Sequence, residues 1–225
     1  SGGGSSSSTT VTKNGQILEE LVHICDGGTV KGVSADYTWP TVTAIQTTTT
    51  TYTTLSGSEI TYTPPDGATE VVYILSIAAS TNAANGMYHV RMMIDGVESG
   101  EEPIAIGEGE SRQYGTLQTI RFVLDAWSGS KTLKLEVRHH WTGTTYQMNI
   151  HKRSWVGDGQ TTSSNELMKP ILNIRAIGTL TTTSGGSSSA PSTTVTEQGQ
   201  ILETLVGVCD GRSVTVKSGT YTFPN

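Results

Sequence analysis

The end of this sequence repeats its beginning. Residues 9–40 and 193–224 align at a constant offset of 184, and 19 of the 32 aligned positions are identical. The segment between them, about residues 41–180, occurs once. A small repeated module has too little apolar surface to form a core alone, so it must pack against another element or another chain. The repeat therefore indicates an array or a self-assembling filament.

The pattern divides the chain into five parts. Tracts rich in Ser, Thr and Gly at 1–8 and 181–192 are typical of flexible linkers. The other parts are the first copy of the repeated module at 9–40, a central domain at 41–180 and the second copy at 193–225. We name the two modules copy 1 and copy 2. Copy 2 is interpreted either as the start of a further unit or as a connector between subunits.

Composition excludes some classes of partner. The formal net charge of the 225 residues is −6, and charged residues make up 15%. Without a basic stripe to neutralise phosphates, we expect no nucleic-acid binding. No apolar run approaches the ~18 residues that a membrane-spanning helix requires. The abundant Thr favours strands, and Ser and Gly favour turns.

The first half of each module leaves its secondary structure open. Its apolar positions fit one face of a helix, but a strand buried on both faces would be equally apolar. Val206-Gly207-Val208 in copy 2 is poor helix material. The Asp-Gly pairs at 26–27 and 210–211 then predict tight turns, followed by strand-forming residues. Each module is thus predicted to contain a β-hairpin, and both copies are predicted to share one local conformation.

The apolar residues of this first half are also the predicted assembly interface, because they are too apolar to remain in water. The residues assigned to it are Ile17, Leu18, Leu21, Val22, Ile201, Leu202, Leu205, Val206 and Val208.

The central domain is a series of short strand candidates separated by Gly, Pro and Asp-Gly breaks. They lie at 41–55, 59–63, 70–78, 87–94, 97–98, 118–126, 131–141, 146–152 and 171–177. This pattern predicts an all-β fold, an antiparallel jelly roll or β-sandwich, flanked by the two modules. Alternation within the segments predicts a core containing Val72, Ile74, Ile120, Phe122, Leu133, Leu135 and Val137.

Several blocks carry a resemblance to a known group. They are CDGRSVTVKSGTYTFPN, TWPTVTAIQ, LSGSEITYTPPDGATEVVYILSI and KPILNIRAIG. In these blocks the chain resembles jelly-roll-like structural and fibre proteins of aquatic phages and algal viruses, over most of residues 9–180 and again over 193–225. The resemblance implies a β-rich protomer that forms fibrils, in virions or outside cells, and it implies no catalytic residues.

Two cysteines occupy equivalent positions in the copies. Cys25 and Cys209 each precede an Asp-Gly pair. They are interpreted as small buried residues, with a disulfide between neighbouring subunits as the alternative. Such a bridge would need a symmetry axis that brings equivalent positions together.

Other side-chain groups suggest ligands only weakly. His139 and His151 come from different strands and could share a metal, but no matching Cys or carboxylate spacing accompanies them. The glutamates of the Gly-rich segment have the oxygen ligands that calcium prefers, without a calcium-loop motif. They could equally pair with Lys152 and Arg153 of a neighbouring subunit. We therefore predict no metal and no cofactor. The glutamates in question are Glu98, Glu101, Glu102, Glu108 and Glu110.

No catalytic motif is present in the sequence, and we do not expect an enzyme. Trp127, Trp141, Tyr146 and Trp155 could form a platform for sugars, although strand aromatics are more often core or interface residues. The sequence therefore predicts a homopolymeric structural protomer of an extracellular or virion-associated fibre, joined through the repeated module. The alternative is a glycan-binding module of the tail-fibre or adhesin type.

Overall fold

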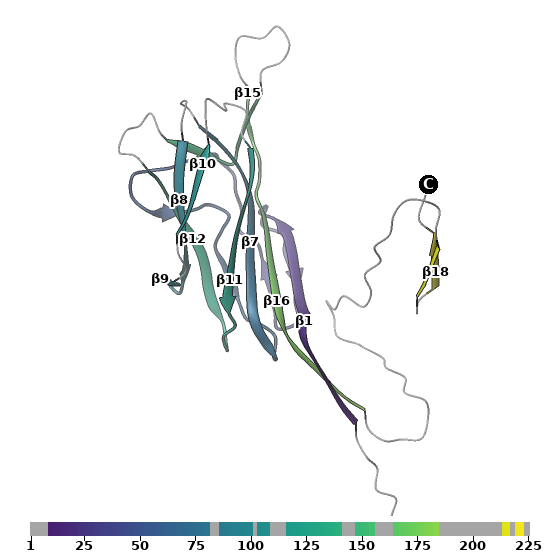
Figure 1. Cartoon of the computed structure of the whole chain (residues 1–225). Coiled ribbons are helices and arrows are strands. Elements are labelled where there is room, and N and C mark those ends of the chain that lie inside the picture. Colours follow the sequence, from purple (N-terminus) through teal and green to yellow (C-terminus); the bar gives the residue numbers. More distant parts are fainter. Residues whose placement is uncertain are drawn as a thin grey trace, which may run out of the picture.

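The computed structural model describes most of the chain up to Ser184 and a short hairpin beyond it. The described residues are 9–81, 86–100, 103–108, 116–140, 147–155, 164–184, 213–216 and 219–222. Within these ranges every helix or strand element is a β-strand, and every strand pair is antiparallel. The predicted all-β antiparallel sandwich is confirmed (Figure 1).

One sheet is built around the long strand β7. Its order is β1-β16-β7-β13-β4, and β11 pairs with the other edge of β7. The strands are β1 (Thr9–Ile24), β16 (Ile171–Ser184), β7 (Ala68–Thr81), β13 (Met148–Ile150), β4 (Gln46–Thr47) and β11 (Thr116–Asp125).

The other sheet is built around β8 and β12. Its order is β10-β8-β12-β5, with β6 also paired to β12 and β9 to β8. The strands are β10 (Ile104–Glu108), β8 (Gly86–Ile94), β12 (Lys131–His139), β5 (Thr53–Thr54), β6 (Ile60–Tyr62) and β9 (Val97–Glu98). The predicted Asp95-Gly96 turn joins β8 to β9, and both its residues have positive φ, as a tight hairpin turn requires.

Three small hairpins complete the described elements. They are β2 (Thr29–Lys31) with β3 (Asp36–Thr38), β14 (Lys152–Trp155) with β15 (Ser164–Leu167), and β17 (Ser213–Val216) with β18 (Gly219–Thr222). β10 and β15 are strands that the sequence analysis did not predict. The hairpins predicted in copy 1 and copy 2 are both present as β2–β3 and β17–β18.

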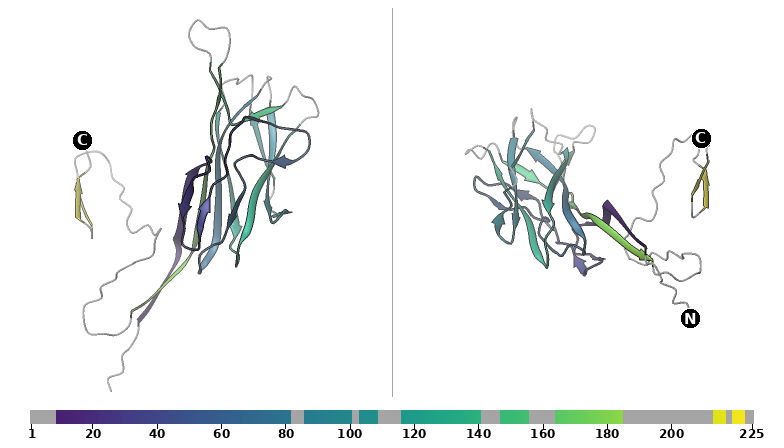
Figure 2. Two further views of the ribbon diagram at one scale, coloured as in Figure 1. Left: turned by 180° about the vertical axis from the view of Figure 1, so that it is seen from behind. Right: turned by 60° about the horizontal axis from the view of Figure 1, so that its bottom comes forward.

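The two sheets face each other (Figure 2), and the buried apolar side chains of the core lie between them. Alternate residues of each strand point inward, which is the expected period of a half-buried strand. Burial is confirmed for the predicted core residues of β11 and β12, namely Ile120, Phe122, Leu133, Leu135 and Val137.

Of the two buried residues predicted in β7, burial is confirmed for Val72 and not for Ile74. The side chains of β7 that point into the cluster between the sheets are those of Val71, Tyr73, Leu75 and Ile77. Val72 is buried but outside this core, and Ile74 is only half-buried. Because β7 is apolar on both faces, alternation of hydrophobicity could not reveal which face points inward.

The first half of copy 1, for which the sequence allowed either a helix or a strand, is a strand. β1 pairs with β16 along its whole length, with register shifts between Lys13 and Gln16 and between Ile17 and Glu19. Gly15 lies at the first shift with a positive φ, a conformation that favours glycine. The two shifts disturb the strand period, and this explains why the apolar residues mimic helical spacing.

The free ends of β1 and β16 form a two-stranded arm that extends beyond the sandwich (Figure 1). Thr9 pairs with Ser184 at the end of the arm, and Thr12 pairs with Thr181. Residues 181–184, predicted to begin a linker, are therefore part of β16.

Candidate assembly site

Copy 1 is an integral part of the sandwich core rather than a module attached to it. Four of its buried side chains join a single apolar cluster with those of both sheets, namely Leu21, Cys25, Tyr37 and Trp39. We define the β1 site as the position that copy 1 occupies beside β16 and over Tyr62 and Gly57. The copy 1 residues buried there are Leu18, Glu19, Leu21, Cys25, Tyr37 and Trp39.

Polar contacts fix copy 1 in the β1 site. The Cys25 thiol donates to the Gly57 carbonyl at 3.2 Å, and the Trp39 indole N–H donates to the Leu172 carbonyl at 3.0 Å. The Tyr37 hydroxyl donates to the carbonyl of Thr63 at 2.9 Å. Burial raises the pKa of Cys25 to about 12, so this thiol is protonated and unreactive at neutral pH.

The carboxylate of Glu19 is the least expected member of the site. Glu19 follows the second register shift of β1, and its side chain points into the core with 1% exposure. It accepts hydrogen bonds from the Tyr62 hydroxyl at 2.7 Å and from the backbone N–H of Val33. Burial and the neighbouring carboxylate raise the pKa of Tyr62, which keeps its hydroxyl a donor. A buried charge is tolerated only with such partners.

Sequence reasoning missed Glu19 and Tyr62 as functional residues. The available signal was a Glu between apolar residues that recurs in copy 2, where Glu203 stands in the same sequence Ile-Leu-Glu. Its burial could not be inferred, because the shift that turns Glu19 inward is a property of the pairing with β16.

Copy 2 keeps most of the side chains that copy 1 buries. Leu202, Glu203, Leu205, Cys209 and Tyr221 are identical to their counterparts, and Phe223 stands where copy 1 has Trp39. These residues lie outside the part of the chain whose side chains the structure describes.

The two module hairpins have the same register. Thr29 pairs with Thr38 in β2–β3, and at an offset of 184 Ser213 pairs with Thr222 in β17–β18. The next pair of partners also matches at this offset: Val30 pairs with Tyr37, and Val214 pairs with Tyr221. The two hairpins therefore share one register. The rest of copy 2 lies outside the described residues, so the equivalence of the whole copies stays a prediction.

One pair of differences between the copies is compensated. In copy 1 a Cβ atom on Gly28 would lie 2.3 Å from the ring of His23, so that position must be glycine. Copy 2 has Arg212 at the position of Gly28, and it has Gly207 at the position of His23. Removing the ring makes room for the new side chain, which indicates that copy 2 suits the same backbone path.

The hairpin tip differs without such compensation. A Cβ atom on Gly32 would lie 2.4 Å from the Tyr37 ring and 2.6 Å from the Glu19 carboxylate. Copy 2 has Val216 at this position and Gly219 in place of Ala35. The same Cβ atom would also lie 2.9 Å from the backbone carbonyl of Ala35, so a side chain at this position requires the backbone of the tip to move as well as the two side chains.

The predicted interface residues of copy 1 do not form one surface. Leu18 and Leu21 are buried in their own sandwich, Ile17 is half-buried and Val22 is 47% exposed on the outer face of the sheet. The predicted residues of copy 2 lie outside the described ranges.

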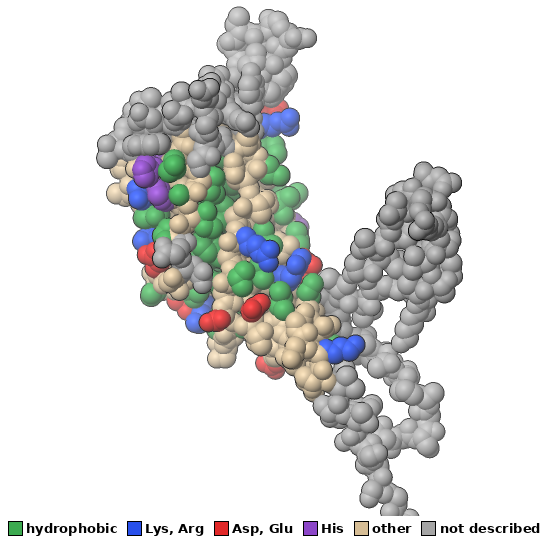
Figure 3. Space-filling model, viewed as in Figure 1, with side chains coloured by type: hydrophobic (Ala, Val, Ile, Leu, Met, Phe, Trp, Pro, Cys, Tyr) green, Lys and Arg blue, Asp and Glu red, His purple; other side chains and the backbone are tan. Residues whose placement is uncertain are grey.

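The outer face of the β7 sheet carries further apolar side chains among charged ones (Figure 3). Val22 and Ile24 of β1 lie beside Asn173 and Ile171 of β16. At the positions of Val22 and Ile24, copy 2 also has apolar residues, Val206 and Val208. Among the large apolar side chains that the structure describes, that of Leu117 in β11 is the most exposed, at 72%.

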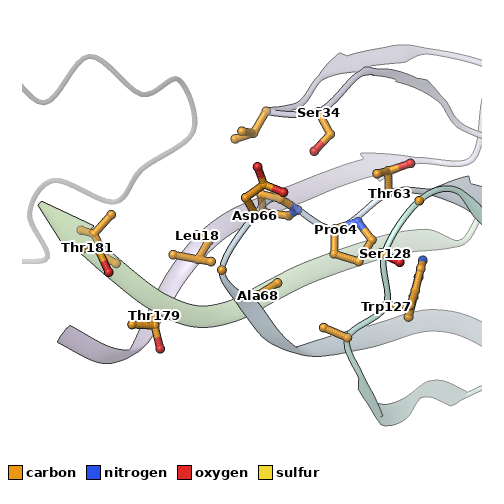
Figure 4. Close-up of a pocket in the computed structure, with 16 residues that line it drawn as sticks. Leu18, Ser34, Thr63, Pro64, Asp66, Ala68, Trp127, Ser128, Thr179 and Thr181 are labelled. Atoms are coloured by element: carbon orange, nitrogen blue, oxygen red, sulfur yellow. The ribbon is translucent and has the colours of Figure 1, made fainter. Parts of the chain in front are cut away.

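A cleft of about 880 Å³ lies at the base of the sandwich, where the arm begins (Figure 4). Copy 1 contributes Leu18 and Ser34, β16 contributes Thr179, and the turn before β7 contributes Asp66. Trp127 lies at the opposite wall, with its ring edge-on to the buried ring of Tyr62. The cleft thus combines hydroxyl groups, one carboxylate and one half-buried indole.

The predicted histidine pair is split between separate contacts. His139 is buried and its Nδ1 lies 3.4 Å from the Thr48 hydroxyl, whereas the Nε2 of His151 lies 2.8 Å from the Ser56 carbonyl. Burial lowers the pKa of His151 to about 4. Instead, the rings of His89 and His140 stack, with ring nitrogens 2.6 Å apart. No group of three or more metal-ligating side chains occurs among the described residues.

The acidic and aromatic candidates are only partly described. Glu98 pairs with Arg91 at 3.0 Å within its own chain. The side chains of the other four glutamates, and those of Trp141, Tyr146 and Trp155, lie outside the described part. Within the same ranges, no helix is long and apolar enough to cross a bilayer.

Comparison with known proteins places the chain in no family. No family model matches it, and no curated protein matches it. Among solved structures it is similar to CBM35 from Paenibacillus barcinonensis, at 17% identity and a TM-score of 0.22, over 70% of this chain and 99% of that one.

Two larger proteins show similarity at the same level. One is a family two carbohydrate esterase from Cellvibrio japonicus, at 13% identity and a TM-score of 0.25, over 77% of this chain and 36% of that one. The other is the VP2 subviral particle of infectious bursal disease virus, at 10% identity and a TM-score of 0.26, over 80% of this chain and 40% of that one. This chain therefore spans little more than a third of either protein, and none of the similarities indicates what it binds.

Proposed function

We propose that this protein is a structural protomer of a fibre, in which copy 2 of one unit fills the β1 site of the next jelly-roll unit. The observation that supports this most directly is that copy 1 completes its own sandwich core. Copy 2 has the same core side chains, and one sandwich has one β1 site. In a fibre, copy 2 of one unit would enter the β1 site of the next and displace that unit's own copy 1, so that each site still holds one module.

The energy available for such a joint is substantial. Five apolar residues of copy 2 correspond to buried residues of copy 1, namely Leu202, Leu205, Cys209, Tyr221 and Phe223. At about 25 cal/mol per Å² of buried apolar area, burying their side chains contributes several kcal/mol before ordering costs. Main-chain pairing with β16 adds a ladder of hydrogen bonds and sets the register. The segment 185–192 is rich in Ser and Gly and lets successive units separate.

Electron microscopy of the purified chain tests the proposal. We expect regular filaments from the native chain. Replacing Leu202 and Leu205 together by Asp should abolish them, because two charges would enter the core of the next unit. Circular dichroism should show that the sandwich of this variant stays folded, since copy 1 is unchanged.

A matched control adds the same charge at positions that face solvent in copy 1. Thr196 and Thr204 correspond to Thr12, which is exposed, and to Glu20, which points to the outer face. The Thr196→Asp/Thr204→Glu variant should form normal filaments. If the Leu202→Asp/Leu205→Asp variant also does so, copy 2 is not the joint.

Glycan binding is the second candidate function, and the cleft in Figure 4 is the observation that favours it. Its hydroxyl groups, the carboxylate of Asp66 and the indole of Trp127 are groups that bind sugars. A glycan array with the native chain and with Trp127→Ala tests it. Binding that the variant loses supports a glycan module, and an array without binding rejects it.

A further inference from the structure

We infer that the β1 site is exchangeable within one chain: copy 2 can displace copy 1 and complete the sandwich from the other end of the sequence. This goes beyond the proposed function and does not depend on it. The inference rests on the geometry of the arm, on the contacts of the β1 site and on the residues that copy 2 retains.

The arm brings copy 2 within reach of its own β1 site. Thr9 begins copy 1 and pairs directly with Ser184, the last residue of β16. Copy 2 begins at Thr193, so eight residues connect it to Ser184. Eight residues span up to roughly 27 Å, and neighbouring strands lie only about 4.8 Å apart. Copy 2 can therefore fold back on β16 as an antiparallel hairpin, in the position and direction of β1.

The other end of the site imposes no obstacle. Copy 1 leads into the sandwich through Pro40 and Thr41, and Val42 donates its backbone N–H to the Cys25 carbonyl at 3.0 Å. A displaced copy 1 stays tethered to the sandwich at Thr41. Residues 41–224 then hold a full set of strands in circularly permuted order.

The contacts of the site suit copy 2. Tyr62 is fully buried, and its hydroxyl needs an acceptor inside the core. Glu203 offers the same carboxylate as Glu19, and Gly199 offers the glycine that the first register shift requires. Cys209 is placed to donate to Gly57, as Cys25 does.

The differences between the copies favour copy 1. Phe223 has no indole N–H to donate to the Leu172 carbonyl, in contrast to Trp39. Thr204 replaces Glu20, which accepts from Arg175 and Asn173 on the outer face. The lost buried hydrogen bond and the lost half-exposed ion pair together correspond to a roughly 10–100-fold preference of the β1 site for copy 1. Val216 at the position of Gly32 acts in the same direction, because a side chain there needs the hairpin tip to move. We therefore expect copy 1 in the site of most native molecules and copy 2 in a minority.

Disabling each copy in the full chain tests the exchange. Leu18→Asp/Leu21→Asp puts two charges in the core through copy 1 and should unfold the sandwich if copy 1 is irreplaceable. We expect this variant to fold, as judged by near-ultraviolet circular dichroism, with an unfolding equilibrium constant roughly 10–100-fold less favourable than that of the native chain. The variant that also carries Leu202→Asp/Leu205→Asp should be unfolded. If the first variant is as unfolded as the second, the inference is wrong.

A disulfide trap reports the exchange in a chain that keeps both modules. Val22 pairs with Asn173 of β16, so Val206 should face Asn173 when copy 2 is in the site. Oxidation of the Val206→Cys/Asn173→Cys variant should accumulate this disulfide within monomers. Val206→Cys/Arg121→Cys, with the second cysteine exposed on β11, is the control that should not form one.

The products of the trap separate this inference from the proposed function. Monomers with the 173–206 disulfide support exchange within the chain, whether or not filaments form. A ladder of covalently joined chains, with no such monomers, contradicts it and places copy 2 in a neighbour's β1 site. Filaments in which no 173–206 disulfide forms contradict the inference as well. They would show that the fibre is held together by a contact other than copy 2 in a β1 site.

Discussion

The buried contact between Tyr62 and Glu19 should contribute more to stability than other tyrosine hydrogen bonds of this core. Tyr62→Phe removes the hydroxyl that Glu19 accepts from at 2.7 Å and leaves the carboxylate with the Val33 N–H. A hydrogen bond to a charged group contributes roughly 1.5–3 kcal/mol, compared with about 1 kcal/mol for a neutral pair. Because Tyr62 would meet Glu203 in the same way, exchange of the copies should not compensate.

Tyr73 provides the matched control. Its hydroxyl is also fully buried and donates to a neutral acceptor, the Ser58 carbonyl, at 2.5 Å. Tyr73→Phe makes the same chemical change and should cost about 1 kcal/mol. Urea unfolding at pH 7, followed by tryptophan fluorescence, would give both values.

The charge itself can be tested in the same assay. In a Glu19→Gln/Glu203→Gln background the acceptor is neutral in both copies, so Tyr62→Phe should then cost only about 1 kcal/mol. The reasoning is refuted if Tyr62→Phe costs no more than Tyr73→Phe in the native background.

Three further outcomes follow from other sites. His151 has a pKa lowered to about 4, against about 6.5 when unfolded, so the unfolded chain binds more protons between these values. Stability should rise with pH through this window by up to about 3 kcal/mol and reach its full value above pH 6.5, and His151→Gln should flatten this rise in urea titrations. The Cys25 thiol should react with iodoacetamide at pH 8 at least roughly 100-fold more slowly in the folded chain than in urea, measured by mass spectrometry. Gly57→Ala should lower the unfolding midpoint far more than Gly96→Ala; both glycines have positive φ, but only at Gly57 would a Cβ meet Pro170 at 2.6 Å.

Much of the fold could be predicted because its strands alternate clearly. β12 has polar residues between Leu133, Leu135 and Val137, and this pattern fixes both the strand and its inward face. β7 shows where the method fails. Its residues from Val71 to Leu75 are all apolar, so alternation could not show which face points inward. Val72 is buried as predicted, but Ile74 is only half-buried, although the strand itself was predicted correctly.

The candidate site could be located from the sequence, but not its architecture. The repeat pointed to residues 9–40 and 193–225 without a structure. It did not reveal that copy 1 lies inside the sandwich, because the pairing of β1 with β16 joins residues more than 140 positions apart. Long-range pairing of this kind leaves no local pattern in a single sequence. The same pairing turns Glu19 inward, so its contact with Tyr62 was equally out of reach.

The arm also determines how a unit responds to tension. A pull applied through the chain on either side of a unit acts at Thr9 and at Ser184, which face each other at the same end of an antiparallel pair. The load therefore opens the hydrogen bonds of β1 and β16 one after another, instead of shearing the whole ladder at once. Peeling the arm from Thr9–Ser184 to Lys13–Leu180 frees about ten residues, or roughly 35 Å of length, while the buried Leu21 and Cys25 remain in place. If units are joined in a fibre as proposed, we expect the arm to act as an extensible segment that opens at low force and closes again when the tension is released.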